Sequence, residues 1–228
     1  MQLPCPIAAV IFDMDGLMLD TERLVLAAWQ QAAQEHGAVL DEQLLLGMVG
    51  LHDRLCRQYL REQLGEQTPV EAIHDRTREL YAKALAEGPP IKPGLIALLD
   101  YLETASLPRA VATSTLRRFA LGNLERAGLL NRFAHIIAGD DICHPKPAPD
   151  VYLQAAAALG VAPALCVVLE DSEPGVRAAL AAGMTPIMIP DLKAPSAEVR
   201  AFGHHIVACL ADAHTLIADA LSAAEALR

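Results

Sequence analysis

Short apolar runs that alternate with helical segments are the feature that most constrains the fold of this chain. Five such runs end abruptly at a loop: Ile7–Phe12, Arg109–Ala112, His135–Ala138, Cys166–Leu169 and Pro186–Ile189. Four segments with helical spacing accompany them: Leu95–Glu103, Arg117–Ala127, Asp150–Leu159 and Gly175–Ala182. Strands that alternate with helices pair in parallel through right-handed crossovers. The pattern therefore predicts an α/β fold with a Rossmann-like parallel sheet, which a sixth, edge strand at Ile206-Val207 would complete.

One long segment interrupts this alternation. From Glu22 to about Pro90 the residues show only helical patterns, in four stretches: Glu22–His36, Asp41–Leu46, His52–Leu64 and Pro69–Glu87. The segment follows the first strand directly, and open α/β sheets bind ligands beyond the carboxyl ends of their strands. An insertion at that place is predicted to be a lid. We therefore expect a core domain of residues 1–16 and 91–228 and an inserted all-α cap domain of residues 17–90.

Composition and charge exclude several classes of partner. The formal net charge is −10 and the basic residues are scattered, which argues against nucleic acids and anionic membrane surfaces. No apolar stretch reaches the ~18 uninterrupted residues that a membrane span requires. The five cysteines are widely spaced and match neither a zinc knuckle nor a CxxC redox pair. With no secretory signal evident and no coiled-coil or exposed strand-edge signal, we expect a cytoplasmic monomer with reduced thiols.

Polar residues gather where the predicted strands end. They are Asp13 and Asp15 after the first strand, Thr113 and Ser114 after the second, Glu170 and Asp171 after the fourth, and Lys146 in a proline-bracketed loop. Parallel strands place these ends at one edge of the sheet, so the residues are expected to share a cleft. Carboxylates this close repel each other unless a cation or a proton compensates them. Oxygen ligands without His or Cys favour a hard cation such as Mg²⁺.

These residues and their order resemble the haloacid dehalogenase-like phosphohydrolase superfamily. The four matching stretches are DMDG, AVATS, HPKPAPD and VLEDSEPGVRAALAAGM. They occur in the right order and span almost the whole chain. The inserted helices resemble the small cap of the subgroup that contains β-phosphoglucomutase and many sugar-phosphate phosphatases. The resemblance implies hydrolysis of a small phosphorylated metabolite, in which Asp13 attacks phosphorus and forms an aspartyl-phosphate.

The resemblance also implies a role for each remaining group. Mg²⁺ would be held by the carboxylates of Asp13 and Asp171 and the backbone carbonyl of Asp15, with Glu170 acting directly or through water. Thr113, Ser114 and Lys146 would bind the phosphoryl group. Asp15 would donate a proton to the leaving alcohol and then take one from the attacking water. In the cap, Thr21, His52 and Arg54 are the candidates for contacts with the substrate.

Each residue also has a purely structural interpretation. An Asp-x-Asp pair can form an Asx-turn or begin a helix, and Thr113 can be a turn residue. Glu170 and Asp171 can belong to the start of the following helix, with Ser172 as its N-cap. An EF-hand is excluded because Gly16 occupies loop position four, where the motif needs its glycine at six. The predicted site would be absent only if all of these structural interpretations were correct at the same time.

Three other functions share parts of this pattern with a phosphatase. A hexose-phosphate mutase of the β-phosphoglucomutase type uses a cap histidine and a cap lysine, whose positions fall near Val25 and Thr77 in this chain. The metal-independent dehalogenase branch lacks the second aspartate of the first motif, which is present here as Asp15. A receiver-like phospho-accepting module has no helical insertion after its first strand. Hydrolysis is therefore the predicted reaction, with the mutase as the alternative.

Overall fold

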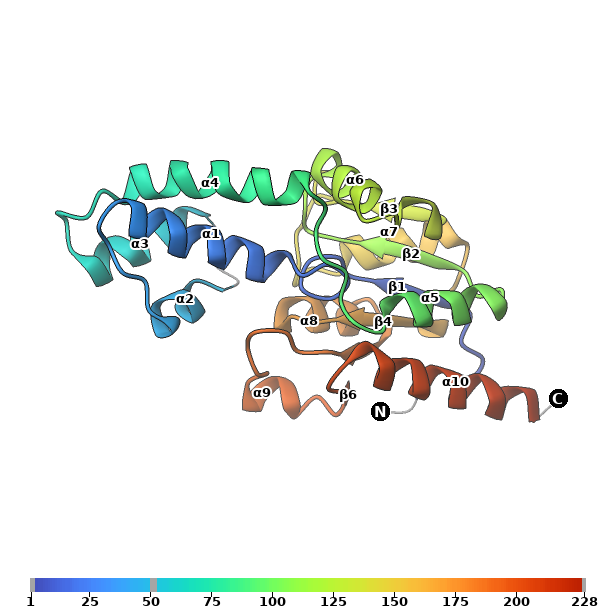
Figure 1. The fold of residues 1–228 in the computed structure, drawn as a ribbon. Helices are drawn as coiled ribbons and strands as arrows, with labels where there is room; N and C mark the ends of the chain where they lie inside the picture. Colours follow the sequence, from blue (N-terminus) through green and yellow to red (C-terminus); the bar gives the residue numbers. More distant parts are fainter. Residues whose placement is uncertain (1–2, 50–52, 227–228) are drawn as a thin grey trace. The chain divides into compact units, whose positions relative to one another are not determined.

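The computed structural model describes residues 3–49 and 53–226, which form two compact units. One unit comprises Met1–Leu19 and Pro90–Arg228, and the other comprises Asp20–Pro89. The first unit contains a sheet of six parallel strands in the order β3-β2-β1-β4-β5-β6 (Figure 1). Its strands are β1 (Ala9–Phe12), β2 (Arg109–Ala112), β3 (His135–Ile137), β4 (Cys166–Glu170), β5 (Thr185–Met188) and β6 (His205–Ile206). The predicted Rossmann-like α/β fold is confirmed.

Both faces of this sheet are covered by helices, because its strands are apolar on both sides. In β1, Val10 and Phe12 face a core cluster that includes residues of α5 (Leu95–Thr104), α6 (Arg117–Arg126) and α10 (Leu210–Ala226). Ala9 and Ile11 face the opposite cluster, which includes residues of α7 (Asp150–Leu159) and α8 (Glu173–Ala181). Alternate side chains of a strand point to opposite faces, so a continuous apolar run is what a doubly covered strand requires.

Three short helices complete the first unit. They are α9 (Ala197–Arg200) and the 3₁₀ turns η1 (Leu130–Arg132) and η2 (Pro163–Leu165).

The strand order has a switch point at the centre of the sheet, between the neighbouring strands β1 and β4. From β1 the next strands along the chain, β2 and β3, lie on one side, and from β4 the strands β5 and β6 lie on the other. In open α/β sheets this switch point is where ligands bind, beyond the carboxyl ends of the strands.

The second unit is built from helices alone in its described residues, as predicted. These are α1 (Thr21–Glu35), α2 (Glu42–Met48), α3 (Asp53–Leu64) and α4 (Val70–Ala86). They pack around their own apolar cluster, which includes Trp29, Leu60 and Ile73. In the described part of the chain, none of the helices combines the length and the apolar character needed to cross a membrane.

The boundary between the units differs slightly from the predicted one. The predicted insertion includes Leu17, Met18 and Leu19, but these residues are buried in the core of the first unit. Leu19 forms an antiparallel bridge with Ile91, and the backbone N–H of Lys92 donates to the carbonyl of Met18 at 2.9 Å. The two connecting segments are therefore tied together inside the first unit, and the helical unit runs from Asp20 to Pro89.

Candidate active site

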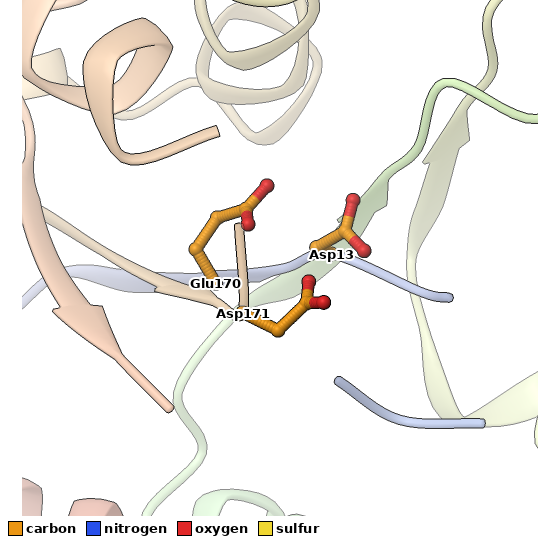
Figure 2. Close-up of side chains that lie close together, drawn as sticks. All are labelled: Asp13, Glu170 and Asp171. Carbon is orange, nitrogen blue, oxygen red and sulfur yellow. The ribbon is translucent and has the colours of Figure 1, made fainter. Parts of the chain in front are cut away.

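Three carboxylates meet beyond the carboxyl ends of β1 and β4 (Figure 2). Asp13 follows β1, Glu170 is the last residue of β4, and Asp171 follows it. One oxygen of each lies within 4.8 Å of the others. Asp13 and Glu170 are buried, and Asp171 is half-buried. The parallel pairing of β1 with β4 thus brings together acids that are more than 150 positions apart in the sequence.

Lys146 joins this cluster from the loop between β3 and α7. Its ammonium group donates three hydrogen bonds: to Asp13 Oδ1 at 2.5 Å, to Glu170 Oε1 at 2.7 Å and to the carbonyl of Ala112 at 3.2 Å. The side chain is only 6% exposed. Burial by itself lowers the pKa of a lysine, but Asp13 and Glu170 outweigh it and raise the pKa of Lys146 well above its usual value. Lys146 is therefore a fixed positive charge beside Asp13.

Glu170 is the best-anchored acid of the cluster. Its Oε1 also accepts a hydrogen bond from the hydroxyl of Tyr152 at 2.9 Å, and its Oε2 accepts from the backbone N–H and the hydroxyl of Ser172 at 2.8 and 2.9 Å. Burial raises the pKa of Glu170, but Lys146 and these hydrogen bonds outweigh burial, so that the pKa lies below its usual value. Glu170 is ionised, and Ser172 also caps α8 through Gly175 as predicted.

Asp13 and Asp171 add more negative charge to the cluster than Lys146 compensates. Burial raises the pKa of Asp13 to about 7, although Lys146 opposes this rise. Burial, followed by the charges of Glu170 and Asp13, raises the pKa of Asp171 well above its usual value. Three carboxylates face one ammonium group, and when all are ionised the cluster carries an excess of two negative charges. A buried excess of this kind is stable only with a proton or a cation beside it.

The residues present fit a divalent cation. The ligand atoms available are carboxylate oxygens, which hard cations prefer, and the excess charge matches that of a divalent ion. The approach of Asp171 to the turn after β1 also requires a residue without a side chain. At Gly16, where φ is +82°, a Cβ atom would lie 2.3 Å from Asp171 Oδ2. The turn is therefore built to let this carboxylate come close.

The loop after β2 supplies hydroxyl groups to the same edge of the sheet. Thr113 is buried, and its Oγ1 accepts a hydrogen bond from the backbone N–H of Thr115 at 3.0 Å. The hydroxyl of Thr115 donates to Asp15 Oδ2 at 2.7 Å. Ser114, between them, is exposed. No local pattern in the sequence predicts a role for Thr115 or Tyr152, because only the placement of their loop and helix beside the acids gives them a partner.

Comparison with known proteins identifies the family. The family model for haloacid dehalogenase-like hydrolases matches residues 10–189. This chain belongs to the haloacid dehalogenase-like hydrolase family. YhcW of Bacillus subtilis is 37% identical over 186 residues, which cover 81% of this chain and 84% of that protein. The phosphorylated carbohydrates phosphatase of Thermotoga maritima is 35% identical over 183 residues, which cover 78% of this chain and 83% of that protein.

A solved structure shows the same fold in another member of the family. The haloacid dehalogenase family hydrolase of Deinococcus radiodurans, whose structure has bound phosphate and sodium, superposes with a TM-score of 0.84 at 28% identity. The superposition covers 95% of this chain and 97% of that chain. This haloacid dehalogenase-like hydrolase thus shares its fold with that protein over almost its whole length.

The candidate substrate contacts of this hydrolase lie in its helical unit. Thr21 is buried at the start of α1, and Arg54 is exposed on α3. His52 lies outside the described residues. Asp20 occupies the N-cap position of α1, and its carboxylate pairs with Arg23 at 2.8 Å. The roles of Thr21, His52 and Arg54 in substrate binding stay predictions.

Proposed function

We propose that this hydrolase is a Mg²⁺-dependent phosphatase that removes phosphate from a small metabolite, such as a sugar or polyol phosphate. The observation that carries the proposal is the Asp13 carboxylate, which is paired with Lys146 and lies beside Glu170 and Asp171. A nucleophilic carboxylate next to a fixed ammonium group and a cation site suits attack on a phosphate ester. The similarity to a phosphatase of phosphorylated carbohydrates supports the substrate class.

The first step requires that negative charge be neutralised. An aspartate that approaches a phosphate dianion is repelled unless cations surround both groups. The carboxylates of Asp13 and Asp171 and the backbone carbonyl of Asp15 would hold Mg²⁺, with Glu170 acting directly or through water. When bound, Mg²⁺ supplies the positive charge that offsets the repulsion. Lys146 adds a second cation, and its longest hydrogen bond, to the carbonyl of Ala112, is the easiest to exchange for a phosphoryl oxygen.

The side chains then carry out a two-step transfer. An oxygen of Asp13 forms a bond to phosphorus, the ester P–O bond breaks, and Asp15 gives its proton to the leaving oxygen. In the second step Asp15 takes a proton from water as that water attacks the aspartyl-phosphate and releases inorganic phosphate. Thr113 is oriented to assist: because its Oγ1 accepts a hydrogen bond from Thr115, its own proton can be donated to a phosphoryl oxygen.

The positions aligned with the mutase histidine and lysine favour hydrolysis. Val25 packs against the apolar cluster of the helical unit. Thr77 is buried, and its hydroxyl donates to the carbonyl of Ile73 at 2.8 Å. Neither side chain is basic. The neighbouring Arg76 is paired with Glu35 at 2.6 Å and with Glu79 at 2.8 Å. Hydrolysis is thus better supported than the mutase reaction.

A screen of phosphorylated metabolites tests the proposed function. The purified protein is incubated with each compound, with and without Mg²⁺, and released inorganic phosphate is measured. We expect release from one or more small phosphate monoesters, loss of that release with EDTA, and its recovery when Mg²⁺ is added back. A product that is an isomer of the substrate, without released phosphate, would favour the mutase. Absence of both products from every compound would contradict the proposal.

Substitutions of the two aspartates separate their roles. Asp13→Asn should abolish turnover, because an amide is a poor nucleophile and a weaker metal ligand. Asp15→Asn should lower kcat by ~10²–10⁴-fold, the usual contribution of acid–base catalysis. The exposed Asp219→Asn on α10 serves as a matched control and should leave kcat unchanged. Near-normal activity of Asp13→Asn would rule out the aspartyl-phosphate route.

A further inference from the structure

We propose that Thr115 is a positioning residue that holds the Asp15 carboxyl group in the orientation needed for proton transfer. The inference rests on the proposed function, in which Asp15 is the acid and base. Its first support is the hydrogen bond from Thr115 Oγ1 to Asp15 Oδ2 at 2.7 Å, which joins the loop after β2 to the turn after β1. Both residues are half-buried. This contact therefore ties the two loops together beside the acids of the site.

One hydrogen bond is enough to orient a carboxyl group. An aspartate side chain has two rotatable bonds, and the last one turns the carboxyl plane freely when neither oxygen has a partner. A donor fixed at Oδ2 removes that freedom. A hydroxyl can donate to Oδ2 before and after Asp15 transfers its proton, so the same contact serves both steps of the reaction. Proton transfer depends on geometry of this kind, since the acid must lie within hydrogen-bond reach of its target.

The backbone of Thr115 is itself held in place. Its N–H donates to Thr113 Oγ1 at 3.0 Å, and its carbonyl accepts from the N–H of Gly139 at 2.9 Å. Gly139 permits this approach, because a Cβ atom there would lie 2.2 Å from the carbonyl oxygen of Ser114. The loop after β3 therefore buttresses the loop after β2, and the hydroxyl of Thr115 has little freedom to move away from Asp15.

The far end of the loop is also anchored. The backbone N–H of Arg117, at the start of α6, donates to Asp140 Oδ1 at 2.6 Å. Its guanidinium group binds Asp141 and donates to the carbonyl of Ile136 at 2.8 Å. The segment 113–117 is thus fixed at both ends, and it carries Thr113 and Thr115 together. One rigid loop would then set both the donor to the phosphoryl group and the orientation of the acid.

A disoriented Asp15 should slow only the steps that move a proton. Loss of an alcohol from a sugar or polyol phosphate requires a proton on the leaving oxygen. Loss of p-nitrophenolate from p-nitrophenyl phosphate does not, because this anion is stable without one. With the nitrophenyl ester, attack by Asp13 should therefore stay fast, whereas hydrolysis of the aspartyl-phosphate, which needs Asp15 as a base, should slow down.

Thr115→Val tests this difference, because valine keeps the branched shape and removes the hydroxyl. We expect kcat on an accepted alkyl phosphate to fall roughly 10- to 100-fold, a part of the full acid–base contribution, with KM little changed. With p-nitrophenyl phosphate we expect a rapid burst of about one nitrophenolate per enzyme molecule, followed by a slow steady state. Thr115→Ser, which retains a hydroxyl, should restore most of the rate. Thr104→Val, which removes a hydroxyl bound within α5, is the control and should change neither substrate's kinetics.

Several outcomes would overturn the inference. It fails if Thr115→Val matches the parent protein on the alkyl phosphate, if the nitrophenolate burst slows as much as turnover of the alkyl phosphate, or if Thr115→Ser does not recover activity. If the valine variant unfolds, Thr115→Ala, assayed below its own melting temperature, decides by the same criteria. The proposed function is judged separately: it fails only if the parent protein releases no phosphate, or if Asp13→Asn retains activity.

Discussion

Glu170 shows how a fully buried acid is kept charged by its neighbours. Lys146 and Tyr152 both donate to its Oε1, and Ser172 donates twice to its Oε2. Tyr152 is completely buried, and the ammonium group of Lys146 lies 4.9 Å from the centre of its ring. Burial, together with the charge of Glu170, raises the pKa of Tyr152 well above its usual value, so its hydroxyl stays a donor. The tyrosine thus supports both partners of the ion pair.

Replacing this hydroxyl should weaken the fold more than the chemistry. Tyr152→Phe keeps the ring under Lys146 and removes one hydrogen bond to a charged group, which should lower the free energy of unfolding by about 1.5–3 kcal/mol. Urea unfolding measures the change. Tyr101→Phe is the matched control, since Tyr101 is half-buried against the ring of His214, and we expect a change within about 0.5 kcal/mol there. Equal effects of the two substitutions would show that the hydroxyl of Tyr152 contributes nothing to stability.

Local sequence patterns predict most of the helices and strands of the core. β2 and α7 have the predicted bounds, because an apolar run or a helical repeat ends at a clear break such as Gly160, which adopts φ +69° after α7. The edge strand β6 is shifted by one residue from its predicted position, since a two-residue strand has little pattern to fix it. The ends of the predicted strands and the proline-bracketed loop likewise predict that Asp13, Lys146, Glu170 and Asp171 are neighbours.

The contacts between loops could not be predicted in the same way. Thr115 lies two residues beyond the predicted Thr113, and nothing in its local sequence distinguishes it from an ordinary turn residue. Its hydrogen bond to Asp15 exists only because β1 and β2 pair in a register that places their following loops side by side. Tyr152 occupies an apolar position in the helical pattern of α7, and only its place beside Glu170 gives its hydroxyl group a hydrogen-bond partner. Such roles depend on long-range packing, which one sequence does not display.

The first turn of α8 packs tightly against the end of β4. A Cβ atom at Gly175 would lie 1.6 Å from Glu170 Oε1, so Gly175→Ala must displace that side chain from Lys146 and Ser172. We expect a loss of about 1–3 kcal/mol in the free energy of unfolding, as overpacking usually costs, and at least a roughly tenfold loss of kcat.

Another helical glycine provides the control for this substitution. At Gly122 in α6 the nearest atom to a Cβ is the flexible end of Arg126, at 3.1 Å, so Gly122→Ala should be neutral or stabilise by up to about 1 kcal/mol. Both variants are compared by thermal unfolding and by phosphate release. Retention of full activity and stability in Gly175→Ala would mean that Glu170 need not hold its observed position.

The acidic cluster should link metal binding to the stability of the folded protein. The folded protein presents Asp13, Glu170 and Asp171 together, whereas the unfolded chain does not, so Mg²⁺ should bind the folded state selectively. At a concentration of 100 Kd this is worth about 2.7 kcal/mol and should raise the Tm measurably. Asp171→Asn should reduce the Mg²⁺-dependent shift, yet it should leave the EDTA-treated protein at least as stable as its parent, because one repelling charge is gone. An equal shift in both proteins would place the metal elsewhere.

The bridge between Leu19 and Ile91 has a consequence for how such a chain can diversify. Both ends of the inserted helices leave the core from adjacent positions, and Lys92 is further tied to Asp191 by an ion pair at 2.6 Å. The chain of the first unit is therefore joined across the insertion by its own contacts. We therefore expect that residues 20–89 can be replaced by a different helical bundle, or by a short turn, without displacing the strands or the acids of the first unit.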